Sequence, residues 1–170
     1  MSTPLPAVDA LSPDQRAIYD MLPLDLTRGL LLTRSSAAPY LALGRSFHDG
    51  RLPAPVREVV ILRVGALTHA AYELHHHIPQ ARACGLTDDL IERVIAGDSA
   101  FDRPELDALM EFVDQLVGAV QGPPPDLTTV QTYYSLGEIA ELTLLVGHYV
   151  MTALFINTLG IEPERQGNDV

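Results

Sequence analysis

Hydrophobic residues recur along most of this chain at the three- and four-residue spacing of an amphipathic helix. The apolar positions between residues 56 and 67, for example, fit this spacing better than the two-residue alternation of a strand. No stretch of sequence alternates clearly, and none repeats at a fixed period. The pattern therefore predicts an all-α fold, a single-domain helical bundle of about seven helices.

Local signals for helix starts and stops divide the chain into these helices. Residues 12–15 have the spacing of a capping box, so a first helix should begin there and end before Pro23. Residues 135–138 repeat that spacing in front of a long apolar helix that should end at Gly160. Pro79 should bend or end the helix in which it lies. Further helices are expected at about 38–47, 56–67, 72–84, 88–96, 104–120 and 127–134.

Composition and charge narrow the class of protein. With 170 residues, of which 47% are apolar, the chain suits one domain over residues 1–170, with residues 1–10 as a loose leader. The formal net charge of −11, with no lysine, argues against nucleic acid or an anionic membrane as a partner. Glu141, His148 and Asn157 inside the last helix disfavour a membrane span. A single cysteine excludes an internal disulfide and fits a cytoplasmic location.

Candidate chemistry concentrates between residues 57 and 85. This segment contains four of the six histidines, whose imidazoles titrate near neutral pH. Residues four apart share a face of a helix, so His69, Glu73 and His77 form one stripe, with Tyr72 and His76 beside it. The segment therefore presents carboxylate and imidazole groups on one side.

An acid–base interpretation of this stripe needs only a carboxylate and an imidazole within hydrogen-bond distance. Glu73 and His77 satisfy this on one helix, and Glu58 can orient His77 if the preceding helix packs antiparallel to it. His75 points away from His77 by helical geometry and is expected to be inert. The alternative is that the histidines are half-exposed surface groups and Glu73 is a solvated charge.

The same cluster offers a metal alternative in which His69, Glu73, His76 and His77 are the ligands. Glu73 and His76 have the E-x-x-H spacing of carboxylate-bridged di-metal bundles. Such sites need a second pair of this kind, which the sequence lacks, and the H-E-x-x-H motif is also absent. We therefore predict no metal site.

Other residues are candidates for substrate contact. His148, midway along the last helix, is either a buried histidine with a backbone or water partner or a residue that faces the same pocket as His77. Arg45 can bind an anionic group by charge-assisted hydrogen bonds, although the sequence does not separate it from the other arginines. With Tyr72 and His76, these two residues form the predicted substrate-binding set.

Two motifs resemble a known family. R-E-x-x-I-L-R-V-x-x-L-T-x-x-x-Y-E-x-x-x-H begins at Arg57 and is followed by A-R-A-x-G-L, and L-x-L-L-V-G-H-Y-x-M begins at Leu142. These motifs resemble the carboxymuconolactone decarboxylase family, whose wider superfamily includes the alkylhydroperoxidase D (AhpD) proteins. The resemblance runs from about Leu41 to Ile161. It implies an all-helical AhpD-like fold with its core at residues 36–161.

The resemblance also implies a chemistry. The peroxidase branch carries a glutamate, a C-x-x-C pair and a histidine, which fall here on Glu58, Ala70, Glu73 and His77, so both thiols are replaced and thiol peroxidase activity is not expected. The decarboxylase branch, described as cofactor-independent, matches at Tyr72, Glu73 and His77. It implies that His77 is the acid or base, Glu58 its orienting partner and Glu73 a second acid, base or positioning group.

We therefore expect a cofactor-independent lyase or isomerase that acts on a small carboxylate or lactone. Leu74 stands where the family commonly has tryptophan, which leaves the substrate open. A non-catalytic, oligomeric small-molecule-binding protein is the alternative, and a metal-dependent enzyme using the histidine cluster is the third. The resemblance further implies a homotrimer or homohexamer, and the apolar last helix suits a subunit interface.

Overall fold

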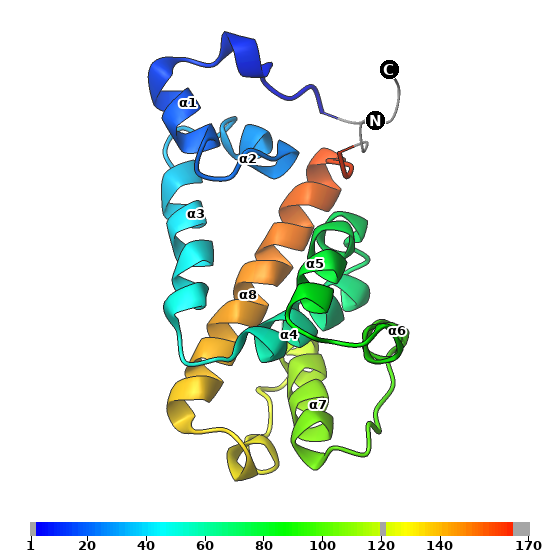
Figure 1. Ribbon diagram of the computed structural model, residues 1–170. Helices are drawn as coiled ribbons and strands as arrows, with labels where there is room; N and C mark the ends of the chain where they lie inside the picture. Colours follow the sequence, from blue (N-terminus) through cyan, green and yellow to red (C-terminus); the bar gives the residue numbers. More distant parts are fainter. Residues whose placement is uncertain (1–2, 120–121, 165–170) are drawn as a thin grey trace.

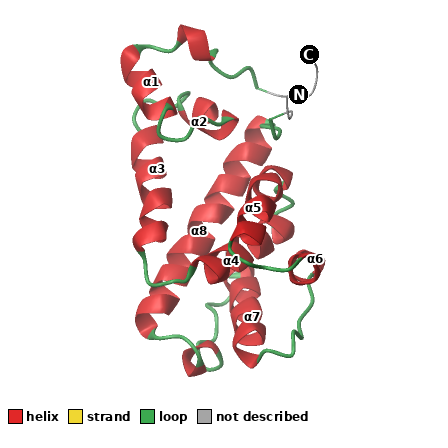
Figure 2. Ribbon diagram, in the orientation of Figure 1, coloured by secondary structure: helices red, strands yellow, loops and turns green. Residues whose placement is uncertain are grey.

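The last helix, α8 (Leu136–Leu159), runs through the middle of the molecule, with the other helices on both sides of it (Figure 1). The computed structural model describes residues 3–119 and 122–164, which form eight α-helices, three short 3-10 helices and no strand (Figure 2). The other α-helices are α1 (Pro13–Tyr19), α2 (Asp25–Leu30), α3 (Ala37–Ser46), α4 (Ala54–Leu67), α5 (Ala71–Ala83), α6 (Asp88–Ala96) and α7 (Pro104–Gly118). The 3-10 helices are η1 (Val8–Ala10), η2 (Phe47–Asp49) and η3 (Val130–Thr132). This single-domain helical bundle confirms the predicted fold class.

Helix ends follow the local signals where those signals are strong. Both predicted capping boxes form: the Ser12 side chain accepts from the Gln15 amide and the Ser135 side chain from the Glu138 amide, and each glutamine or glutamate side chain bonds back. Gly160 ends α8 in the left-handed conformation, with φ of 62°. These contacts lie within four residues of sequence, so they could be predicted from it.

Helix α2 is the element that the sequence pattern misses. It has six residues, contains Gly29 and begins after Leu24, whose side chain makes no capping hydrogen bond. The amide of Asp25 instead donates to the Glu164 carboxylate at 2.6 Å. A partner 139 residues away replaces the local cap, so no nearby residue signals that a helix starts here.

Helix α5 contains Pro79, as the expected range of 72–84 implied, and continues through it to Ala83. Pro79 and His75 are exposed, so water can bond the His75 carbonyl that proline leaves without a partner. Two local expectations are corrected. The helix expected at 127–134 reduces to the 3-10 turn η3. Residues 3–10 are not loose, because the Thr3 amide donates to the Leu159 carbonyl and the Arg28 guanidinium to the Pro6 carbonyl. Residues 1–2 and the predicted end of α7 at residue 120 lie outside the described residues.

Two apolar cores hold the bundle together. The larger one surrounds α4, which packs against α5, α6, α7 and α8, so that positions 57–65 are all buried. The smaller one joins α2, α3, the start of α5 and the end of α8. The seam between these cores, where α3, α5 and α8 meet, is one of the places at which polar side chains enter the interior.

The exposed side of α8 is apolar. This helix is long and apolar enough to cross a membrane by length and composition, and 44% of its most apolar window is buried inside the protein. Its exposed large side chains are Leu136, Leu144, Met151 and Leu154. With Ala140, Gly147 and Thr158, they follow one stripe at spacings of three or four residues.

Candidate active site

Helices α4 and α5 bring three ionisable side chains together inside the protein. Glu58 lies in the second turn of α4, and Glu73 and His77 lie four residues apart on α5, on the face that packs against α4. Glu58 is 3% exposed and Glu73 is 4% exposed. His77 Nδ1 lies 2.8 Å from Glu58 Oε2, and His77 Nε2 lies 3.5 Å from Glu73 Oε2. The imidazole therefore sits between two buried carboxyl groups.

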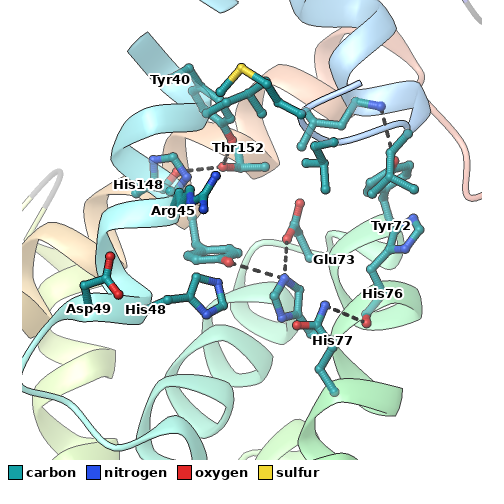
Figure 3. Close-up of a pocket in the computed structure, with 18 residues that line it drawn as sticks. Tyr40, Arg45, His48, Asp49, Tyr72, Glu73, His76, His77, His148 and Thr152 are labelled. Atoms are coloured by element: carbon teal, nitrogen blue, oxygen red, sulfur yellow. Dashed lines mark hydrogen bonds and ion pairs between the residues drawn. The ribbon is translucent and has the colours of Figure 1, made fainter. Parts of the chain in front are cut away.

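These contacts fix the direction of the His77 ring. A carboxylate at 2.8 Å from Nδ1 accepts a hydrogen bond, so Nδ1 carries a proton and donates it. In the neutral ring Nε2 is then the acceptor, and the Tyr149 hydroxyl donates to it at 3.3 Å. Tyr149 also packs edge-on against the ring, with centroids 5.2 Å apart. Figure 3 shows the His77 ring turned toward Glu73, the residue that lies 3.5 Å from Nε2.

Glu73 and Tyr149 both keep their protons more firmly than in water. Burial raises the pKa of Glu73 from 4.5 to about 7, and the neighbouring His77 opposes that rise. Burial, with the negative charges of Glu73 and Glu58, raises the pKa of Tyr149 well above its ordinary value. Near neutral pH the Glu73 carboxyl thus exchanges a proton readily, whereas the Tyr149 hydroxyl stays neutral.

A cavity of about 550 Å³ opens beside these groups. That volume suits a small organic molecule. The side that carries Glu73 and His77 is formed by α5 and α8, and α3 and the segment around α2 lie opposite (Figure 3). The lining residues are Met21, Leu22, Leu24, Leu26, Tyr40, Leu41, Gly44, Arg45, His48, Asp49, Tyr72, Glu73, His76, His77, Gln80, His148, Tyr149 and Thr152.

Tyr40, His148 and Thr152, where α3 meets α8, form a polar but uncharged part of the cavity wall. The Thr152 hydroxyl donates to the His148 carbonyl at 2.8 Å, which leaves its oxygen free to accept from the Tyr40 hydroxyl. The His148 ring packs against Tyr40, Phe47 and Tyr149. Burial lowers the pKa of His148 to about 4, so its ring is neutral at physiological pH.

The predicted substrate-binding residues all line the cavity, but in different ways. Arg45 is exposed at the cavity margin and His148 is buried in its wall. Tyr72 and His76 are engaged within the protein: the Tyr72 hydroxyl donates to Glu164 Oε1 at 2.9 Å, and His76 Nε2 lies 2.8 Å from Glu164 Oε2. Glu164, the last described residue, thus fixes the positions of Tyr72 and His76 in the cavity wall.

The alternative metal ligands do not form a cluster. His69 is exposed in the turn before α5, with a positive φ of 54°, and His76 is paired with Glu164. Within residues 3–119 and 122–164, no three histidine, cysteine or acidic side chains are placed to hold a metal ion. His75 is exposed and does not line the cavity, as helical geometry predicted.

Several lining residues carried no sequence signal. Tyr149 follows His148 directly, yet its hydroxyl contact with His77 depends on the packing of α8 against α5. Tyr40 and Thr152 meet across 112 residues of sequence. A helical projection around His148 would have placed Thr152, one turn later, on the same face.

Comparisons with known proteins agree with this architecture. Residues 37–115 match the sequence model of the carboxymuconolactone decarboxylase family, a range that contains Glu58, Glu73 and His77. No curated protein matches the chain. Among solved structures, the chain resembles a protein of unknown function from Agrobacterium tumefaciens with a proposed role as the antioxidant defence protein AhpD. The TM-score is 0.73 at 16% identity, over 79% of this chain and 94% of that chain, a likeness that establishes the fold.

Proposed function

Residues 37–115 match the carboxymuconolactone decarboxylase family, and we propose that the chain belongs to this family and is a cofactor-independent lyase or isomerase acting on a small carboxylate or lactone. The observation that carries this proposal is the 2.8 Å contact between Glu58 and His77 Nδ1. It holds His77 Nε2 toward the cavity, beside a second carboxyl group on Glu73. A fixed base next to a carboxyl with a near-neutral pKa is the arrangement that proton transfer at carbon requires.

The proposed decarboxylation is balanced without a cofactor. The bond between the substrate carboxylate and its neighbouring carbon breaks, CO₂ leaves, and the bonding electrons delocalise into a conjugated carbonyl as an enolate. The protonated Glu73 carboxyl then gives its proton to the carbon and becomes a carboxylate. His77 Nε2, 3.5 Å from that carboxylate, returns a proton taken from solvent. The sum is one proton consumed and one CO₂ released.

Isomerisation uses the same groups without loss of CO₂. His77 Nε2 or the Glu73 carboxylate removes a proton from a carbon next to the substrate carbonyl, and the other group delivers a proton to a second carbon. Glu58 stabilises the imidazolium that forms in between. Tyr149 donates a hydrogen bond to Nε2 in the free protein and has to move it to the substrate or the new carboxylate during the reaction.

Thiol peroxidase chemistry is not part of the proposal, although the Agrobacterium protein is linked to antioxidant defence. Ala70 is fully buried at one of the two positions where that chemistry needs a thiol, and Glu73 occupies the other. Cys84 caps the end of α5 and is not among the residues that line the cavity. Reduction of a hydroperoxide therefore lacks both its nucleophile and its resolving thiol at this site.

The direct test is turnover of 4-carboxymuconolactone in D₂O, followed by NMR for loss of substrate and for deuterium at the protonated carbon. Glu58→Gln and His77→Gln should each reduce the rate by about 10²–10⁴-fold, the range for general acid–base groups. His75→Gln is the matched control, because it changes an adjacent imidazole on the same helix that does not line the cavity.

If that lactone is not turned over, other small keto acids and unsaturated lactones extend the test. A protein that binds such compounds but never exchanges their carbon-bound protons with D₂O would be a binding protein and would contradict the proposal. Equal rates in His77→Gln and wild type would contradict the assigned site.

A further inference from the structure

Among residues 3–119 and 122–164, His148 Nδ1 is the one buried side-chain nitrogen or oxygen atom without a hydrogen-bond partner, and His148 lies in the cavity wall. Its side chain is buried, with 6% of the residue exposed, and Nδ1 makes no hydrogen bond within the described residues. The acid–base steps above do not use it. A buried ring nitrogen without a partner is costly, so its presence in a cavity wall calls for an explanation.

The tautomer of the His148 ring follows from which of its two nitrogens is buried. Buried N–H groups without an acceptor are rarer than buried acceptors without a donor. The proton therefore belongs on Nε2, the nitrogen that is not sealed in the protein, and the bare Nδ1 faces the interior. His148 then presents a fixed N–H donor, with no charge, to whatever fills the cavity.

Gly44 leaves room at this nitrogen. It lies within α3, where glycine costs about 0.5–1 kcal/mol of helix stability relative to alanine. A Cβ at this position would lie 3.2 Å from His148 Nε2, closer than ordinary van der Waals contact. Gly44 also lines the cavity, so the missing side chain leaves the donor accessible from that side.

We infer that His148 Nε2–H is a hydrogen-bond donor for a carbonyl oxygen of the ligand, held across the Tyr149 ring from His77. The Tyr149 ring lies edge-on to both imidazoles, with its centroid 5.2 Å from that of His77 and 5.4 Å from that of His148, and all three residues line the same cavity. The catalytic role of this donor rests on the proposed function. In that function, electrons released near His77 move into the ligand carbonyl, and a fixed neutral donor stabilises the carbonyl oxygen as it gains negative charge.

The test uses binding and not turnover. Its probe is γ-butyrolactone, with tetrahydrofuran as the same ring without the carbonyl. In protein with ¹⁵N-labelled histidine, the lactone should shift the His148 Nε2–H resonance. His148→Phe should weaken lactone binding about tenfold, the loss of one neutral hydrogen bond, and leave tetrahydrofuran binding unchanged.

Further variants test the His148 hydrogen-bond donor separately from folding and from catalysis. Gly44→Ala keeps every imidazole and should weaken lactone binding as much as His148→Phe, so it carries the test if the phenylalanine variant does not fold. Gly118→Ala makes the same change at the end of α7, where no atom lies within 4 Å, and should have no effect. His77→Gln should still bind lactone, so failed catalysis is distinguishable from a failed subsite.

Two results would overturn the inference. One is a proton on Nδ1 of His148 in the free protein, which removes the donor from the cavity. The other is equal lactone affinity in wild type, His148→Phe and Gly44→Ala, which places the carbonyl elsewhere.

Discussion

His77 Nδ1 lies 2.8 Å from Glu58 Oε2, in a contact that joins α5 to α4 inside the protein. Glu58 is buried and has no other side-chain hydrogen bond within the described residues. The pair therefore serves two purposes. It orients the imidazole toward the cavity, and it satisfies a carboxylate that would be costly to bury alone.

This double role predicts a measurable coupling between the two residues. Glu58→Ala and His77→Ala should each lower the free energy of unfolding by about 1–3 kcal/mol, because each leaves a buried polar group without its partner. The double variant should cost less than the sum, by about 1–2 kcal/mol. Urea denaturation at pH 7 measures these values, with exposed Glu92→Ala as the control. Strict additivity would show that the contact does not form in solution.

Glu73 should make the protein less stable as the pH rises. Its pKa is about 7 when folded and 4.5 ordinarily, so between these values the folded state holds more protons than the unfolded state. The contribution of Glu73 to stability thus falls from pH 4.5 to pH 7, by about 3 kcal/mol in total. Glu73→Gln should remove this loss and raise the melting temperature at pH 8 more than at pH 5. A variant less stable than wild type at pH 8 would contradict the raised pKa.

His148 should make the protein less stable as the pH falls. Its folded pKa of about 4 lies below the ordinary 6.5, so the unfolded state holds more protons in this interval. The stability that the neutral ring preserves is lost as the pH falls from 6.5 toward 4, again by about 3 kcal/mol. In His148→Phe, melting temperatures between pH 4 and 6.5 should decline less than in wild type. Parallel declines would show that His148 is not buried in its neutral form.

The apolar stripe on α8 predicts self-association. Leu144 and Leu154 are 59% and 64% exposed, and a second copy of the chain could cover them. If these leucines lie in a subunit interface, Leu144→Glu and Leu154→Glu should shift the protein toward monomer in light-scattering and sedimentation measurements. Leu32→Glu changes a leucine that is 50% exposed away from α8 and should leave the mass unchanged. A wild-type protein that is monomeric at all concentrations would contradict this prediction.

Glu164 should stabilise the wall of the cavity. Its carboxylate bonds the Asp25 amide, the Tyr72 hydroxyl and His76, so Glu164→Ala removes one acceptor from three donors. We expect a loss of about 1–3 kcal/mol in the free energy of unfolding. The nearby, exposed Glu162→Ala is the control and should change it by less than about 0.5 kcal/mol. Equal effects of the two substitutions would show that the contact is absent in solution.

The residues that could be predicted are those whose partners lie nearby in the chain. The Ser12 and Ser135 caps are local, and the proximity of Glu73 to His77 follows from helix geometry alone. The roles of Glu164 and Tyr149 could not be read in this way. Their partners are 92 and 72 residues distant, and the contacts exist only after the helices have packed.

The paired carboxyl and imidazole groups and the apolar part of the cavity wall come from different stretches of the chain. Glu58, Glu73 and His77 lie within the family-matched residues 37–115, whereas the apolar wall around Met21, Leu22, Leu24 and Leu26 precedes them. The apolar wall can therefore be changed without substituting Glu58, Glu73 or His77. For an engineer, a library confined to residues 21–26 would vary which molecule enters while leaving the reacting groups intact.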